Sequence, residues 1–144
     1  MHCNQMKAVL VKNIKPCGLV WDPSKECKVV AASESQGPLR HCTMNLIDCV
    51  AHAQGSGAWS LNSDFEVHKD TNEKAYLLTK YDVYLSHEPC IMCSMALVHS
   101  RVARVFFAQP SPKCGGLYSK ARLQNISSLN HAFEVYQMTW CCSE

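Results

Sequence analysis

The sequence lacks the features that mark membrane, secreted and fibrous proteins. Glycine and proline occur only six times each in 144 residues, and there is no internal repeat or low-complexity tract. No apolar run approaches the roughly 20 residues needed to span a bilayer. Residues 1–15 contain neither a long apolar segment nor a small-residue cleavage site, so they do not resemble a secretory signal. We therefore expect a single intracellular domain over residues 1–144.

A strong excess of charge is also missing. The 14 basic and 12 acidic residues leave a formal net charge of +2, which permits a nucleic-acid partner without requiring one. Hydrophobic residues make up 47% of the chain, enough for a core that needs no disulfide bonds. We interpret the ten cysteines as thiols in a reducing compartment, some packed in the core and some available to a metal. Disulfide bonds in a secreted protein are the alternative.

The pattern of apolar residues predicts an α/β domain. Strand-like segments bounded by turn residues lie at 18–21, 28–32, 81–86, 102–108 and 133–138. Helical periodicity is found at 41–54, and residues 91–99, which follow Pro89, are predicted to form a short apolar helix. The first two strands should form an antiparallel pair, and the strand–helix–strand order that follows predicts parallel pairing. Residues 55–78 are polar and begin with Gly-Ser-Gly, which is typical of a mobile surface insertion.

Two cysteines at the start of the second predicted helix form the clearest chemical motif. Cys90 and Cys93 follow Pro89, and cysteines three apart project from one side of a helix. A helix N-terminus lowers the pKa of a thiol, which favours the thiolate that a metal binds. His41 opens the other predicted helix and is the natural third ligand. A His/Cys/Cys set leaves one tetrahedral position of a zinc ion open, as in catalytic sites.

Two other interpretations of Cys90 and Cys93 remain open. The first is a redox-active pair, although such pairs lie near the start of a small thioredoxin-like fold whose element order differs from the one predicted here. The second is that both cysteines are buried and purely structural.

His41 and the Pro-Cys-x-x-Cys motif resemble the zinc deaminases, whose signature is H-x-E…P-C-x-x-C. The resemblance implies a cytidine deaminase-like three-layer α/β/α fold with a mixed sheet of about five strands, and Zn²⁺ held by His41, Cys90 and Cys93. In these enzymes the glutamate carries protons to and from the zinc-bound water. Thr43 occupies that position, and its hydroxyl cannot do this at neutral pH. Losing a general acid/base costs about 10²–10⁴-fold in rate, so we assign no catalytic residue.

Further segments resemble the tRNA adenosine deaminases: 81–84, 87–90, 95–107 and 129–135. One branch of that family, the non-catalytic partner subunits, lacks the glutamate and commonly has valine there, so Thr43 is an additional departure. The resemblance implies a subunit without activity of its own. It would pair with a catalytic subunit, and the heterodimer would convert the wobble adenosine of tRNA to inosine in the nucleus and cytoplasm.

The resemblance also suggests where the partner and the RNA bind. The helix containing Cys93, together with Arg101, would lie near the catalytic subunit. Family members usually carry an N-terminal region that helps to hold the tRNA, and this chain lacks it. Independently of the resemblance, a thiolate from Cys141 or Cys142 could close the zinc site, because structural zinc sites are closed; the alternative is a cysteine pair at the end of the chain that binds no metal. The candidate phosphate contacts are the basic residues Arg101, Arg104, Lys113, Lys120 and Arg122.

Two other functions remain open. An active hydrolytic deaminase of a nucleobase or nucleoside would need another proton carrier, and Glu88 is the nearby carboxylate. We expect a structural or surface role for Glu88 instead. The other function is a zinc-stabilised interaction module outside RNA modification.

Overall fold

One mixed sheet organises the chain. The computed structural model describes residues 17–24, 28–60, 66–67 and 76–139. Their strands pair in the order β3-β2-β1-β4-β5-β6. β1 is antiparallel to β2 and β4, whereas β4, β5 and β6 run parallel. The strand bounds are β1 Cys17–Asp22, β2 Lys28–Glu34, β3 Glu66–Val67, β4 Asp82–His87, β5 Arg104–Gln109 and β6 Glu134–Gln137.

The predicted α/β architecture is confirmed, including the opening antiparallel pair and the parallel β4–β5 crossover. The two-residue β3, which lies inside the predicted insertion 55–78, extends the sheet from five strands to six. Of that insertion, residues 61–65 and 68–75 lie outside the described residues. Because β3 pairs with β2 over only two residues, it leaves no periodic pattern in the sequence.

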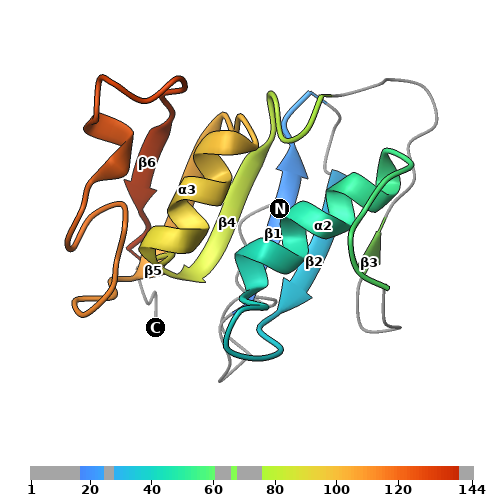
Figure 1. Ribbon diagram of the computed structural model, residues 1–144, viewed down its shortest axis with the longest axis horizontal. Helices are drawn as coiled ribbons and strands as arrows, with labels where there is room; N and C mark the ends of the chain where they lie inside the picture. Colours follow the sequence, from blue (N-terminus) through green and yellow to red (C-terminus); the bar gives the residue numbers. More distant parts are fainter. Residues whose placement is uncertain (1–16, 25–27, 61–65, 68–75, 140–144) are drawn as a thin grey trace, which may run out of the picture.

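Both described α-helices, α2 (Cys42–Ala53) and α3 (Ile91–His99), lie over the same face of the sheet (Figure 1). The predicted three-layer fold has a helix layer on each face of the sheet. Among the described residues, α2 and α3 form one of these two layers. The core lies between this layer and the sheet, and its fully buried side chains include Val20, Val83, Leu85, Leu46, Leu97, Val98, Val105 and Phe107. α2 buries the predicted apolar residues Leu46 and Val50. α3 buries Leu97 and Val98, whereas Ile91 and Met92 at its start are exposed.

A glycine allows α2 to pack closely against the sheet. A Cβ atom at Gly18 of β1 would lie 2.6 Å from Leu85 Cδ2 and 2.9 Å from Leu46 Cδ1. Only a residue without a side chain fits between α2 and β4 at this point. The close approach fixes the position of α2, and therefore of His41 at its start.

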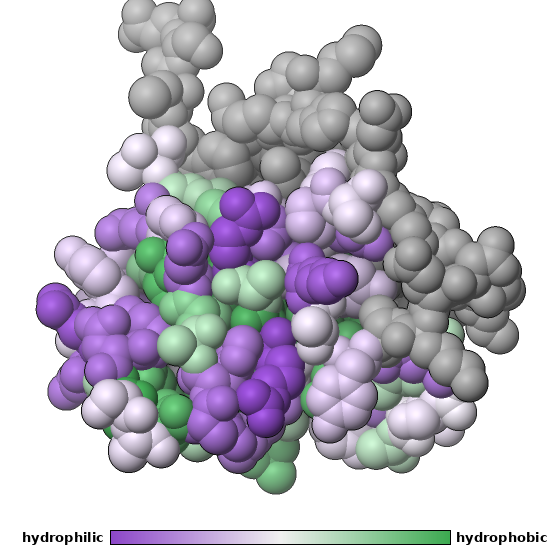
Figure 2. Space-filling view, turned by 90° about the horizontal axis from the view of Figure 1, so that it is seen from above, coloured by the Kyte–Doolittle hydropathy of each residue, from purple (hydrophilic) through white to green (hydrophobic). Residues whose placement is uncertain are grey.

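The two ends of the sheet differ in what they display. The carboxyl ends of β4 and β5 lead toward the starts of α2 and α3 at the bottom of Figure 1. Figure 2 looks onto the opposite end, where hydrophilic residues are interleaved with small hydrophobic patches. Among the described residues, no helix combines the length and the apolar character needed to cross a membrane.

Candidate metal centre

His41 is held in place as the N-cap residue of α2. The Ser35 hydroxyl accepts a hydrogen bond from the backbone N–H of Cys42 at 3.1 Å, which satisfies one of the free donors of the helix start. Asn45 is buried, and its side-chain amide donates to the carbonyl oxygens of Glu34 (2.8 Å) and Arg40 (3.3 Å). These contacts tie the start of α2 to the end of β2 and orient the histidine.

Cys90 and Cys93 are positioned by the turn from β4 into α3. Cys90 is the N-cap residue of α3, and Cys93 lies one turn later with its side chain buried. Cys90 also forms an isolated antiparallel bridge with Gly115, and the N–H of Gly116 donates to the carbonyl oxygen of Pro89 at 2.9 Å. The two thiols are therefore supported from both sides, by the helix and by the loop after β5.

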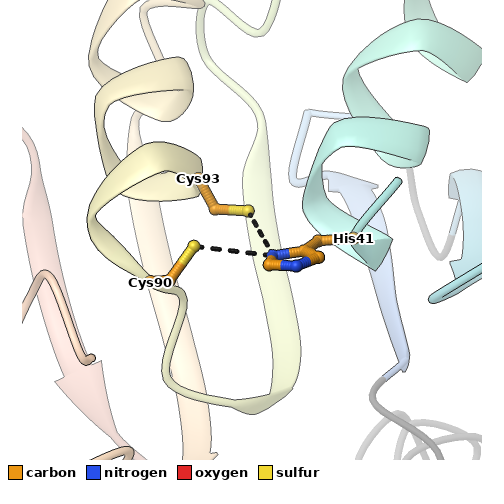
Figure 3. Close-up of side chains that lie close together, drawn as sticks. All are labelled: His41, Cys90 and Cys93. Carbon is orange, nitrogen blue, oxygen red and sulfur yellow. Dashed lines mark hydrogen bonds between the residues drawn. The ribbon is translucent and has the colours of Figure 1, made fainter. Parts of the chain in front are cut away.

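The three side chains converge as the sequence predicted (Figure 3). His41 Nδ1 lies 3.5 Å from Cys90 Sγ and 3.4 Å from Cys93 Sγ. In a tetrahedral zinc site, bonds of about 2.3 Å to sulfur and about 2.0–2.1 Å to nitrogen separate such ligand atoms by about 3.6 Å. The donor set and its spacing therefore fit a metal ion, and in the described part of the chain these residues form the one His/Cys/acidic group that could hold one.

The pKa of the Cys93 thiol differs from the sequence-based expectation. A helix N-terminus was expected to lower it, but burial raises this pKa above its ordinary value and the neighbouring Cys90 raises it further, while a hydrogen bond with the Thr43 side chain opposes the shift. Burial also raises the pKa of Cys42 to about 11. Burial thus favours the protonated thiol, whereas metal ligation requires the thiolate. A bound cation would have to supply the attraction that favours the thiolate.

Thr43 lies at the wall of a pocket that opens beside the three ligands. The pocket has a volume of about 350 Å³. Thr43 is 2% exposed, on the first turn of α2. Within the pocket the glutamate position of the zinc deaminases thus carries a hydroxyl group. The other side chains that line the pocket come from several elements: Ser35, Cys42, His87, Glu88, Ser111 and Cys114.

Glu88 does not replace the missing glutamate, because its carboxylate is bound elsewhere. The side chain is 4% exposed. Its oxygens accept backbone hydrogen bonds from Ser111 (2.9 Å), Tyr118 (2.7 Å) and Ser119 (2.8 Å). Burial by itself would raise the pKa of Glu88, but the hydrogen bonds from Ser111 and Ser119 outweigh burial and lower it. Glu88 is therefore a fixed anion with a structural role, as expected from the sequence.

The five predicted basic residues do not form one group. Arg101 follows the end of α3 and donates to the carbonyl oxygen of Asn130 at 3.0 Å. Arg104 begins β5 and binds both carboxylate oxygens of Asp82, at 2.8 Å and 2.5 Å. Both therefore lie at the end of the parallel strands remote from the metal ligands. The other three, Lys113, Lys120 and Arg122, lie on the loop that follows β5.

Residues 4–109 match the family model described as the cytidine and deoxycytidylate deaminase zinc-binding region. The chain belongs to this deaminase family. A tRNA-specific adenosine deaminase, TAD3 of Arabidopsis thaliana, is 49% identical over 136 residues, which cover 82% of this chain and 34% of that protein. The mouse (Mus musculus) "Probable inactive tRNA-specific adenosine deaminase-like protein 3" is 37% identical over 140 residues, covering 83% of this chain and 40% of that protein. The chain thus spans well under half the length of these relatives.

Solved structures of deaminases share the fold. A chain from a structural study of A-to-I editing by tRNA:A34 deaminases superposes with a TM-score of 0.68 at 18% identity, covering 95% of this chain and 96% of that chain. The dCMP deaminase of cyanophage S-TIM5 gives a TM-score of 0.54 at 16% identity, covering 96% and 100%. At these identities, the likeness establishes the deaminase fold alone.

Sequence reasoning named the three side chains that converge but missed most of the pocket around them. Ser35, Ser111 and Cys114 reach the pocket from loops whose sequences carry no periodic signal. In the sequence, only the adjacent glycines Gly115 and Gly116 indicated that the backbone after β5 passes close to other residues. The predicted zinc-closing residue, Cys141 or Cys142, lies outside the described residues.

Proposed function

We propose that this chain is the non-catalytic, zinc-binding subunit of a tRNA adenosine deaminase that forms inosine at the wobble position. The observation that carries the proposal is Thr43, buried beside a His/Cys/Cys centre where a deaminase needs a carboxylate. The relatives named as TAD3 or as an inactive adenosine deaminase-like protein support it. So does the fission yeast (Schizosaccharomyces pombe) relative, 31% identical over 121 residues, which is named a tRNA-specific adenosine deaminase subunit.

The metal at this centre would be zinc with a structural role. His41 comes from the start of α2, and Cys90 and Cys93 come from the start of α3. When bound, zinc would cross-link the two helix starts and stabilise the face of the domain that they form. Among the described residues that line this pocket, none provides a carboxylate that is free to transfer a proton, because Glu88 is held by the loop.

The catalytic partner would bind next to α3. The first turn of this helix exposes two large apolar side chains, Ile91 (49% exposed) and Met92 (38%), and the loop before His41 exposes Leu39 (69%). All three are close in sequence to His41, Cys90 or Cys93, which line the pocket, and exposed apolar side chains are typical of a protein interface. We infer that the glutamate-bearing deaminase subunit covers this surface.

The tRNA would contact the loop after β5, which we call the Glu88 loop (residues 110–122). Lys113 and Lys120 are exposed, and Lys113 lies between the pocket-lining residues Ser111 and Cys114. Tyr118 is half exposed, with the Arg122 guanidinium 5.9 Å from its ring centre. Cationic and aromatic side chains on one loop suit a phosphate backbone and unstacked bases. The complex would act in the nucleus and cytoplasm.

Reconstitution with a catalytic subunit tests the proposal. The chain should co-purify with a deaminase subunit that carries the H-x-E signature, and inosine formation in tRNA should require both chains. Metal analysis should find about one zinc per copy of this chain. A catalytic subunit that binds and edits tRNA equally well without this chain would contradict the assignment.

A further inference from the structure

The Glu88 loop is folded around a buried carboxylate. Glu88 Oε1 accepts the backbone N–H groups of Leu117 (3.2 Å), Tyr118 (2.7 Å) and Ser119 (2.8 Å), and Oε2 accepts the N–H of Ser111 (2.9 Å) and the Ser119 hydroxyl. Successive backbone N–H groups that point at one anion form a nest, the arrangement by which proteins bind phosphate. Here the anion belongs to the chain itself, and it fills the nest.

The loop packs closely on Glu88. A Cβ atom at Gly115 would lie 2.2 Å from the carboxyl carbon of Glu88, so the backbone passes directly over the carboxylate. The Glu88 main chain is fixed as well, because its N–H donates to the carbonyl oxygen of Gln109 (2.7 Å) and its carbonyl accepts the Ser111 hydroxyl (2.9 Å). Both ends of the loop are therefore tied to one residue.

The Glu88 loop exposes the side chains of Lys113, Tyr118 and Lys120 to solvent. Lys113 lies between Ser111 and Gly115, Tyr118 carries one of the bound N–H groups, and Lys120 donates its N–H to the Gly115 carbonyl oxygen at 3.1 Å. The carboxylate thus sets the backbone positions from which the two lysines and the tyrosine project. Without it, four backbone N–H groups would have no acceptor, and the loop would have to rearrange.

We propose that Glu88 is a positioning residue for RNA binding: its carboxylate orders the Glu88 loop so that Lys113, Tyr118 and Lys120 meet the tRNA together. Glu88 itself does not touch the RNA, because its oxygens are occupied by the loop. The inference rests on the proposed function and adds the residue that organises the RNA-binding surface of this subunit.

The direction in which Glu88→Gln changes tRNA affinity distinguishes a positioning role from long-range electrostatics. Glu88→Gln removes a negative charge beside a basic loop, so long-range electrostatics alone predicts tighter binding of a polyanion. Loss of positioning predicts weaker binding, because the amide offers one acceptor oxygen where the carboxylate offers two and brings an N–H₂ group against backbone donors. The two explanations therefore give opposite results for the same protein.

The experiment uses the complex of this chain with its catalytic subunit and a tRNA that has adenosine at the wobble position. For Glu88→Gln we expect binding about ten-fold weaker and a salt dependence less steep by about one phosphate contact, with the zinc content unchanged. Hydrogen exchange should accelerate at the amides of residues 111 and 117–119. Ser119→Ala, which removes one donor and keeps the carboxylate, should change binding much less.

Equal or tighter tRNA binding by Glu88→Gln, or unchanged exchange at the four amides, would overturn the inference. Failure of the proposed function looks different. In that case the wild-type complex would bind tRNA no better than the catalytic subunit alone, which would remove the RNA contact and this inference with it.

Discussion

At the scale of single residues, the chain has the His/Cys/Cys set of the zinc-deaminase signature and a threonine at the position of its glutamate. His41, Cys90 and Cys93 lie at the separation that a tetrahedral metal requires. Thr43 instead makes a hydrogen bond with the Cys93 thiol. A hydroxyl in this place supports a metal ligand and cannot accept a proton from water at neutral pH. In the proposed function, this substitution would leave a metal at the centre a structural role without a catalytic one.

Replacing His41 with alanine should remove the zinc and destabilise the fold. A ligand that binds only the folded state contributes about 4 kcal/mol when its free concentration is 1,000 times Kd. The variant should lack this contribution, and a chelator should then lower its free energy of unfolding no further. Metal analysis and denaturant unfolding with and without chelator measure both effects. His99→Ala, at an exposed position on α3, is the matched control and should keep its zinc. One retained zinc per chain in the His41 variant would contradict the ligand assignment.

At the scale of elements, the Glu88 loop and the two helix starts are brought together by the parallel β4–β5 pair. The loop is basic on its exposed side and lies next to the pocket, whereas Arg101 and Arg104 are used in contacts at the other end of the strands. This arrangement reduces the candidate RNA contacts to one loop.

Charge reversal on this loop should weaken tRNA binding by the complex. Lys113→Glu combined with Lys120→Glu should flatten the salt dependence, by a slope of about 0.7–0.9 for each phosphate that the variant no longer binds. Lys80→Glu reverses one charge, half the change of the double variant, on an exposed lysine in the turn before β4, away from the pocket, and should have little effect. Binding titrations at several salt concentrations compare the variants. If the Lys80 variant weakened binding as much as the double variant, non-specific electrostatics would explain the result.

The elements and the His/Cys/Cys cluster were predictable because their signals are local. The periodicity of 41–54 and the apolar segment after Pro89 located the two helices, and the spacing of Cys90 and Cys93 placed two thiols on one side of a helix. The hydrogen bonds from Ser111 and Tyr118 to the Glu88 carboxylate were not predictable. They join residues 23 and 30 positions apart, and the donors are backbone N–H groups that every sequence contains. The raised pKa of Cys93 was missed for a related reason, because burial depends on how α3 packs in the finished fold.

At the scale of the whole molecule, the proposed role is to support chemistry that another chain performs. It spans about 34–40% of the length of the TAD3 and deaminase-like relatives described above, which are longer proteins. The exposed apolar residues Leu39, Ile91 and Met92 neighbour pocket-lining residues in the sequence, and the basic loop contributes Ser111 and Cys114 to the same pocket. A surface of this kind suits a subunit that joins a catalytic partner and contributes to holding RNA.

Ammonia release by the zinc-loaded chain alone tests the central claim most directly. The purified chain is incubated with tRNA, adenosine, cytidine or guanine, and ammonia is measured over time. With Thr43 in the acid/base position, we expect no release above the uncatalysed background. Addition of the catalytic subunit should start inosine formation in tRNA. Steady, zinc-dependent release of ammonia by the chain without any partner, at a rate typical of enzymes, would contradict the account.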